Sequence, residues 1–161
     1  DSPAKGFGKA LACCYGRVRG WRFRPKLLQW MCFGSFNKGF GQEGGPAAWI
    51  CSDPEVLTEY YKDPLCTFRF TANGFKGLLG LMQDCFSPEG WQGDRPQMPV
   101  HFISGAEDPC RGSDEALQQA AELMRRVGYV HVDVKLYPGM RHEILNETDR
   151  QTVWDDILGL L

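Results

Sequence analysis

The sequence predicts an α/β fold with parallel strands. From residue 98 onward the pattern reads strand, helix, strand, helix, which is typical of such folds. The 161 residues are 43% hydrophobic and 24% charged, an ordinary composition for one globular domain with a core. Two strands do not make a stable open sheet, so we expect the chain to hold only part of the fold.

The C-terminal pattern follows from local signals. Residues 99–105 are a short apolar run bounded by Pro and Gly, which predicts a strand buried on both faces. A helix then begins after Ser113 and ends at Gly128. Residues 130–136 alternate apolar and polar side chains, which indicates a second strand. Residues 148–151 fit a capping box and predict the last helix.

The first 90 residues predict helices and no strand. Apolar side chains recur at helical spacing over residues 6–18 and 71–85. Ser52 or Asp53 can cap a short helix that has Pro54 in its first turn. These helices indicate a region of a different character from the strand-containing C-terminal part.

Gly-rich and Pro-rich stretches separate these elements. Residues 34–47 predict a long irregular connection, and residues 87–99 predict a polar linker. The linker is the clearest internal boundary, so we predict a helical region over residues 1–90 and a core segment over residues 91–161.

Charge is unevenly distributed along the chain. The net charge is −2, yet residues 1–40 carry +7 and the remainder carries −9. The basic, aromatic stretch over residues 17–30 admits three interpretations: nucleic-acid binding, a lipid-facing surface helix, or a solvated basic face. We favour the solvated face, and we expect no nucleic-acid partner.

The seven cysteines form no C-x-x-C pair and do not cluster with the three histidines along the sequence. This spacing disfavours a structural zinc site. An odd count of cysteines, no apolar run of membrane-spanning length and no signal-peptide pattern predict a cytoplasmic protein with free thiols. The chain begins without Met, as if it were cut from a longer one.

Two residues in the predicted loops suit acid–base chemistry. Asp108 follows the first predicted strand, and His142 follows the second. The carboxyl ends of parallel strands meet at one edge of a sheet, so these loops should be neighbours. A carboxylate beside an imidazole fixes its tautomer and stabilises the imidazolium form. The sequence therefore predicts an acid–base pair.

Longer motifs surround this pair. The segments concerned are residues 105–109 (GAEDP), residues 136–147 (LYPGMRHEILNE), and residues 33–38 and 49–68 in the helical region. Together they resemble the lysophospholipase and monoacylglycerol-lipase-like α/β-hydrolases, often labelled serine aminopeptidase-like. The resemblance covers nearly the whole chain. It implies the C-terminal part of an α/β-hydrolase fold: a helical cap insertion over residues 1–90, then the last two parallel core strands with flanking helices.

The resemblance also implies a mechanism. The family uses a serine nucleophile on a G-x-S-x-G turn, His142 as the base and Asp108 as its acid partner. None of the six serines here lies in such a motif. We therefore expect this chain alone to be inactive and to need the missing N-terminal half of the same fold. The parent is expected to hydrolyse lipid esters of the lysophospholipid or monoacylglycerol type, without a metal or cofactor.

Alternatives remain open at this point. An aminopeptidase or amidase of the same fold and a non-catalytic interaction module are the competing functions. Glu107 is a rival acid next to Asp108. The aromatic residues of the cap that are weak candidates for an acyl pocket are Trp49, Tyr60, Phe68, Phe70 and Phe75.

The remaining candidates are given lesser roles. His101 and His131 lie in predicted strands, so we interpret both as structural. Cys110 follows the acid, but the sequence places no histidine or cation beside it, so we do not expect a nucleophile there. A basic, aromatic cap would suit an amphiphilic acyl ester as substrate and transient contact with a membrane surface.

Overall fold

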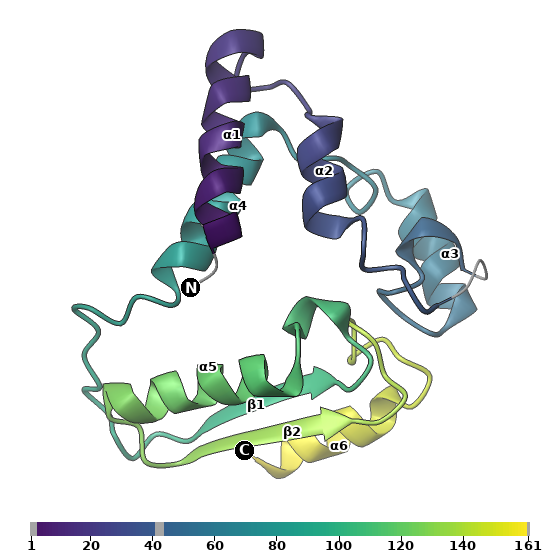
Figure 1. The fold of residues 1–161 in the computed structure, drawn as a ribbon. Coiled ribbons are helices and arrows are strands. Elements are labelled where there is room, and N and C mark those ends of the chain that lie inside the picture. Colours follow the sequence, from purple (N-terminus) through teal and green to yellow (C-terminus); the bar gives the residue numbers. More distant parts are fainter. Residues whose placement is uncertain (1–2, 41–43, 161) are drawn as a thin grey trace. The chain divides into compact units, whose positions relative to one another are not determined.

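The computed structural model describes residues 3–40 and 44–160, so part of the predicted connection over residues 34–47 lies outside the described residues. The chain forms two compact units (Figure 1). The first comprises Asp1–Ser35 and Phe68–Trp91, and the second comprises Phe36–Thr67 and Gln92–Leu161. The chain passes from the first unit into the second close to the predicted boundary at residue 90, and residues 36–67 group with the C-terminal segment.

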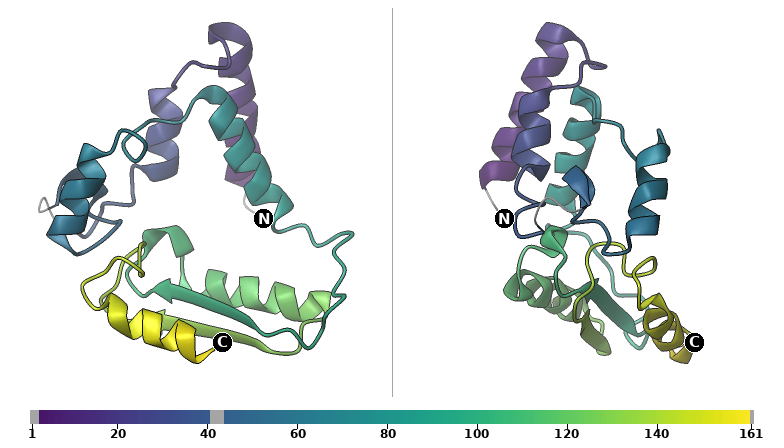
Figure 2. Two further views of the ribbon diagram at one scale, coloured as in Figure 1. Left: turned by 180° about the vertical axis from the view of Figure 1, so that it is seen from behind. Right: turned by 90° about the vertical axis from the view of Figure 1, so that its right-hand side faces the viewer.

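The first unit is helical, as predicted. It contains α1 (Pro3–Arg19), α2 (Lys26–Phe33) and α4 (Ala72–Asp84), and α1 lies beside α4 (Figures 1 and 2). Thr71 caps α4 by accepting a hydrogen bond from the Gly74 amide at 3.1 Å. The core is formed by three fully buried side chains, Ala12, Leu28 and Phe75. Among the described helices, none is long and apolar enough to span a bilayer.

The second unit begins with turns and a short helix. A 3-10 turn over Gly45–Ala47 precedes α3 (Pro54–Lys62). Asp53 caps α3 by accepting from the amides of Glu55 at 2.9 Å and Val56 at 3.4 Å. The predicted short helix is therefore confirmed with Asp53 as its cap, which leaves Ser52 available for another contact.

The rest of the second unit is the predicted α/β segment. Its elements are β1 (Val100–Gly105), a 3-10 turn η2 (Pro109–Arg111), α5 (Asp114–Val127), β2 (Val132–Tyr137) and α6 (Arg150–Gly159). The strands are parallel, in a register that runs from Val100 opposite Val132 to Gly105 opposite Tyr137. The helices α5 and α6 lie on opposite sides of the strands (Figures 1 and 2). This arrangement brings both carboxyl ends to one edge.

Two predicted details are wrong. The sequence predicts a first strand that is buried on both faces, but Val100 to Ser104 are only partly buried. Only two strands pair in the described part of the chain, so each strand forms an edge of the sheet. The capping box is also absent, because Asp149 precedes α6 with φ −94° and ψ 27° and makes no side-chain cap bond. Leu161, at the end of the predicted last helix, lies outside the described residues.

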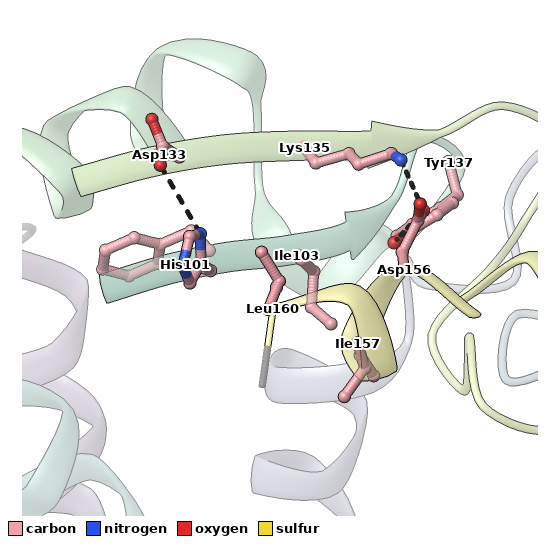
Figure 3. A pocket seen from close by; sticks show the side chains of 9 residues that line it. His101, Ile103, Asp133, Lys135, Tyr137, Asp156, Ile157 and Leu160 are labelled. Carbon is pink, nitrogen blue, oxygen red and sulfur yellow. Dashed lines mark hydrogen bonds and ion pairs between the residues drawn. The ribbon is translucent and has the colours of Figure 1, made fainter. Parts of the chain in front are cut away.

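A hollow on the α6 side of the strands contains polar groups that are separate from the predicted pair. The side chains that line it are His101, Phe102, Ile103, Asp133, Lys135, Tyr137, Asp156, Ile157 and Leu160 (Figure 3). Asp156 pairs with Lys135 and accepts a hydrogen bond from the Tyr137 hydroxyl at 2.9 Å. Burial, and then this bond to Asp156, raise the pKa of Tyr137 to about 12. His101 faces Asp133 at 3.5 Å, on the strands and away from Asp108 and His142.

Candidate acid–base site

The loops that follow β1 and β2 are joined through their backbones. The amide of Ala106 donates to the Tyr137 carbonyl at 2.9 Å, and the amide of Glu107 donates to the Met140 carbonyl at 3.0 Å. A Cβ on Gly105 would lie 2.1 Å from the carbonyl oxygen of Arg141. The absence of a side chain at Gly105 thus allows the two loops to approach each other closely.

Asp108 is held in this junction by the turn that it caps. Its side chain is only 8% exposed, and it accepts a hydrogen bond from the Cys110 amide at 2.8 Å at the start of η2. Its other carboxylate oxygen lies 3.0 Å from Nδ1 of His142. The turn after β1 therefore presents a fixed carboxylate to the histidine of the turn after β2.

His142 is paired on one side and open on the other. Its side chain is 42% exposed, although Asp108 is buried. The hydrogen bond from Asp108 raises the pKa of His142 from its usual 6.5 to about 10, with a further contribution from Cys110, while desolvation acts in the opposite direction. The pair therefore favours the imidazolium form, which is the form that a general base reaches when it accepts a proton.

Segment 48–53 supports the histidine loop from the other side. The amide of His142 donates to the Trp49 carbonyl at 3.4 Å, and the amide of Glu143 donates to the Ile50 carbonyl at 2.8 Å. The ring centroid of Trp49 lies 5.1 Å from that of His142, at an interplanar angle of 49°. The indole thus limits the positions that the imidazole can take.

A buried carboxylate joins the same two segments. Glu147 is 1% exposed and accepts hydrogen bonds from the Ser52 amide at 3.1 Å, from the Ser52 hydroxyl, and from the Arg141 amide at 2.8 Å. A charge-assisted bond to a buried carboxylate is stronger than a neutral one. Glu147 therefore fixes the backbone immediately before His142 to a segment distant in the sequence.

Arg141 adds a second link between these segments. Its guanidinium donates to the carbonyls of Ala48 at 2.6 Å and Cys51 at 3.1 Å, and it lies 4.5 Å from the centroid of the Phe40 ring. Cys51 is fully buried, and its thiol donates to the Asn146 carbonyl at 3.4 Å. Side chains on both sides of His142 thus anchor its loop.

Comparison with known proteins identifies the family. Residues 8–149 match the family described as serine aminopeptidase, S33. The chain belongs to this family. A monoacylglycerol lipase from Mycolicibacterium smegmatis is 30% identical over 125 residues, which cover 77% of this chain and 42% of that lipase.

Solved structures show the same fold at low sequence identity. A thermostable carboxyl esterase from Bacillus coagulans matches with a TM-score of 0.82 and 22% identity, over 98% of this chain and 52% of the esterase. A monoglyceride lipase from Saccharomyces cerevisiae matches with a TM-score of 0.60 and 21% identity, over 97% of this chain and 47% of the lipase. The chain therefore holds part of an α/β-hydrolase fold and spans about half the length of these relatives.

The folded chain brings only some of the predicted site residues together. Asp108, His142 and Trp49 are neighbours, whereas Glu107 is exposed and uses its amide to join the two loops. Tyr60 packs beside the cluster around Leu57, and its hydroxyl donates to the Cys66 carbonyl at 2.7 Å. Three further aromatic candidates belong to the first unit: Phe68, Phe70 and Phe75. Catalytic and substrate-binding roles for all of these residues stay predictions.

Sequence reasoning missed three residues near His142. Glu147 bonds to Ser52 and Arg141 bonds to Cys51, partners that lie 90 or more positions away, so no local pattern could reveal these two links. Cys110 carried a signal, since it occupies the same turn as Asp108. The prediction that no histidine lies beside Cys110 is wrong: the thiol and the imidazole of His142 belong to one cluster in the folded chain.

Proposed function

We propose that this chain is the part of a serine hydrolase that carries the acid and the histidine of the catalytic triad, and that the parent protein hydrolyses carboxylic esters of lipids. The supporting observation is the Asp108–His142 bond of 3.0 Å between the loops that follow two parallel strands. This edge is where α/β folds place their functional groups. The serine and the oxyanion hole would come from the other half of the fold.

The two residues have different tasks in the proposed reaction. His142 in its neutral form, whose population grows as pH rises toward the pKa of about 10, takes the proton of the serine hydroxyl while the serine oxygen bonds to the ester carbonyl carbon. The imidazolium then gives this proton to the departing alcohol, and water repeats the cycle on the acyl-enzyme. Asp108 holds Nδ1 and stabilises the imidazolium. Trp49 keeps the ring in place, and it can also line the acyl site.

The substrate class is proposed from the relatives and from the helical region. Lipases and an esterase are among the proteins that this chain resembles. In the first unit, Phe7, Trp30 and Phe68 are exposed, and that unit also carries most of the basic residues of the N-terminal stretch. Apolar and cationic side chains together suit monoacylglycerol or lysophospholipid molecules, and contact with the surface of a membrane or micelle. We therefore propose residues 1–90 as the cap.

Amide hydrolysis is the second candidate because the matched family is described as serine aminopeptidase. The same pair serves an amide, since protonation of the leaving amine needs the same imidazolium. The free state of the seven cysteines supports the cytoplasm as the location for either activity.

Labelling separates these possibilities from a non-catalytic role. A chain that joins these 161 residues to the upstream half should react with a serine-directed fluorophosphonate, and His142→Ala should abolish labelling. Ester turnover well above amide turnover supports the lipase assignment. If the joined chain folds but neither reacts with the fluorophosphonate nor hydrolyses esters, the non-catalytic interaction module is the function that remains.

The 161-residue chain should itself be inactive, because no serine in it has the G-x-S-x-G setting. Purified chain is assayed with short and long acyl esters, and the His142→Ala variant serves as the matched control. Turnover by the purified chain that disappears in the variant would contradict this expectation.

A further inference from the structure

Three different metal-ligating groups meet at the acid–base site. One ligand atom from each of Asp108, Cys110 and His142 lies within 4.8 Å of the other two. Asp108 is buried, whereas Cys110 and His142 are exposed, so solutes can reach the cluster from solvent. We propose that these three residues form a binding site for a soft divalent cation such as Zn²⁺.

The ligand set is suited to this kind of ion. Thiolate, imidazole and carboxylate are the groups that bind Zn²⁺, and a thiolate favours Zn²⁺ or Cd²⁺ over Mg²⁺ and Ca²⁺. Ligand atoms around one tetrahedral zinc ion lie about 3 to 4 Å apart, from its usual bond lengths. The exposed Cys110 side chain can close the remaining gap by a change of rotamer. Water would take the fourth position.

Charge and anchoring also favour the cation. A thiolate at Cys110 and the carboxylate of Asp108 together neutralise a divalent ion. His142 ligates as the neutral imidazole, so binding of the ion releases the proton of the ring. The positive charge of the Arg111 guanidinium is partly offset by its ion pair with Asp114, and the guanidinium also donates to the Ala106 carbonyl at 2.6 Å. Both loops are fixed at their bases by backbone bonds, so the three ligands are held near one another before an ion arrives.

The proposed site is inhibitory rather than catalytic. An imidazole nitrogen whose lone pair binds a metal cannot accept a proton, and coordination through Nδ1 would also break the 3.0 Å bond to Asp108. The ion would therefore remove the acid–base pair from use. This consequence rests on the proposed hydrolase function, whereas metal binding itself does not.

Metal binding is tested on the 161-residue chain with Co²⁺ and Zn²⁺ alone. Co²⁺ should give a thiolate-to-metal charge-transfer band and the visible absorption of tetrahedral cobalt, and Zn²⁺ should displace it. Cys110→Ser should lose the charge-transfer band and weaken Zn²⁺ binding at least about 100-fold, because loss of an outer-sphere partner alone costs 10 to 100-fold. His142→Ala should also weaken binding. Far-ultraviolet circular dichroism checks that each variant is folded.

The matched control is Cys66→Ser, which removes another exposed thiol of the second unit. It should bind both metals as the unaltered chain does. The proposal is overturned if the chain shows no charge-transfer band up to millimolar Co²⁺, or if Cys110→Ser binds Zn²⁺ as tightly as the unaltered chain. It is equally overturned if the band is lost in Cys66→Ser and kept in Cys110→Ser.

A second arm examines the consequence for catalysis. In the joined chain, the concentration of Zn²⁺ that halves ester hydrolysis should rise at least about 10-fold in Cys110→Ser, each variant being compared with its own metal-free rate. If the joined chain has no hydrolase activity but the short chain binds Zn²⁺ through Cys110, the proposed function fails while the metal site stands. Zn²⁺ binding through Cys110 without inhibition would overturn the inhibitory role.

Discussion

The two buried carboxylates near the histidine loop use their charge in different ways. Asp108, 8% exposed, faces the ring of His142, whereas Glu147, 1% exposed, faces the backbone amides of Ser52 and Arg141 together with the Ser52 hydroxyl. The ring can gain or lose a proton, but the amides cannot. Asp108 therefore sets an ionisation state, and Glu147 sets the position of a loop.

This difference predicts that the two acids can be separated by experiment. A change at Asp108 should alter the titration of His142 with a small cost in stability, because water can reach the exposed ring. A change at Glu147 should cost stability, because its donors lie between two packed segments.

Glu147→Ala should have the largest effect. It leaves the amides of Ser52 and Arg141 without their charged acceptor, and it removes the partner of the Ser52 hydroxyl. Buried donors that lose their acceptor cost about 1–3 kcal/mol each, so we expect a loss of roughly 3–5 kcal/mol in the free energy of unfolding. Urea denaturation measures this loss, and amide hydrogen exchange at Ser52 and Arg141 should accelerate.

The matched variant Glu147→Gln keeps the size of the side chain and one acceptor oxygen. It should still lower the free energy of unfolding by about 1–3 kcal/mol, because the amide nitrogen of Gln would face a donor of the site. This loss is smaller than that of Glu147→Ala, because the remaining oxygen still accepts. An equal loss in the two variants would mean that the charge and the second acceptor oxygen of the carboxylate, and not side-chain volume, are what matter at this position.

Gly105→Ala should have the next largest effect. Its Cβ would lie 2.1 Å from the Arg141 carbonyl oxygen and 2.3 Å from that of Met140, and backbone at this junction cannot move without breaking the bond from Glu107. Overpacking of this kind costs about 1–3 kcal/mol. Gly77→Ala in α4 is the control, since its Cβ would meet no atom within 4 Å. Equal stability of the two variants, measured by urea denaturation, would contradict the close approach.

Sequence predicted Asp108 and His142 because short-range signals mark both. Each follows a recognisable strand, and parallel strands bring their carboxyl ends together whatever the intervening helix contains. Glu147 gives no such signal, because its partner Ser52 lies 95 positions earlier, where the local pattern predicts a helix cap. Local patterns thus identified the elements, whereas the contacts that hold the loop depend on the fold.

Asp108→Asn should cost less stability than the changes at Glu147 and Gly105, but it should clearly lower the pKa of His142. In the folded chain its pKa lies above the usual 6.5, mainly because of the bond to Asp108. A raised folded-state pKa adds stability that is fully present below about pH 6.5 and is lost as pH rises through the folded value of about 10. Asp108→Asn should move the pKa down toward 6.5, as measured by NMR of the ring protons.

Glu147→Gln is the reference for this titration. As long as the loop stays folded, it should leave the pKa of His142 much closer to that of the unaltered chain than Asp108→Asn does. A larger shift of the His142 pKa in Glu147→Gln than in Asp108→Asn would contradict the assignment of separate roles to the two carboxylates.

Glu107→Gln should have the smallest effect, although Glu107 is the acid next to Asp108. Its side chain is exposed, and its contribution to the junction is a backbone amide that the substitution keeps. An exposed change of this kind alters stability by no more than about 0.5 kcal/mol. The NMR titration of His142 should also stay close to that of the unaltered chain. A fall in the His142 pKa as large as that in Asp108→Asn would make Glu107 the functional acid, and the burial of Asp108 would then serve only its turn.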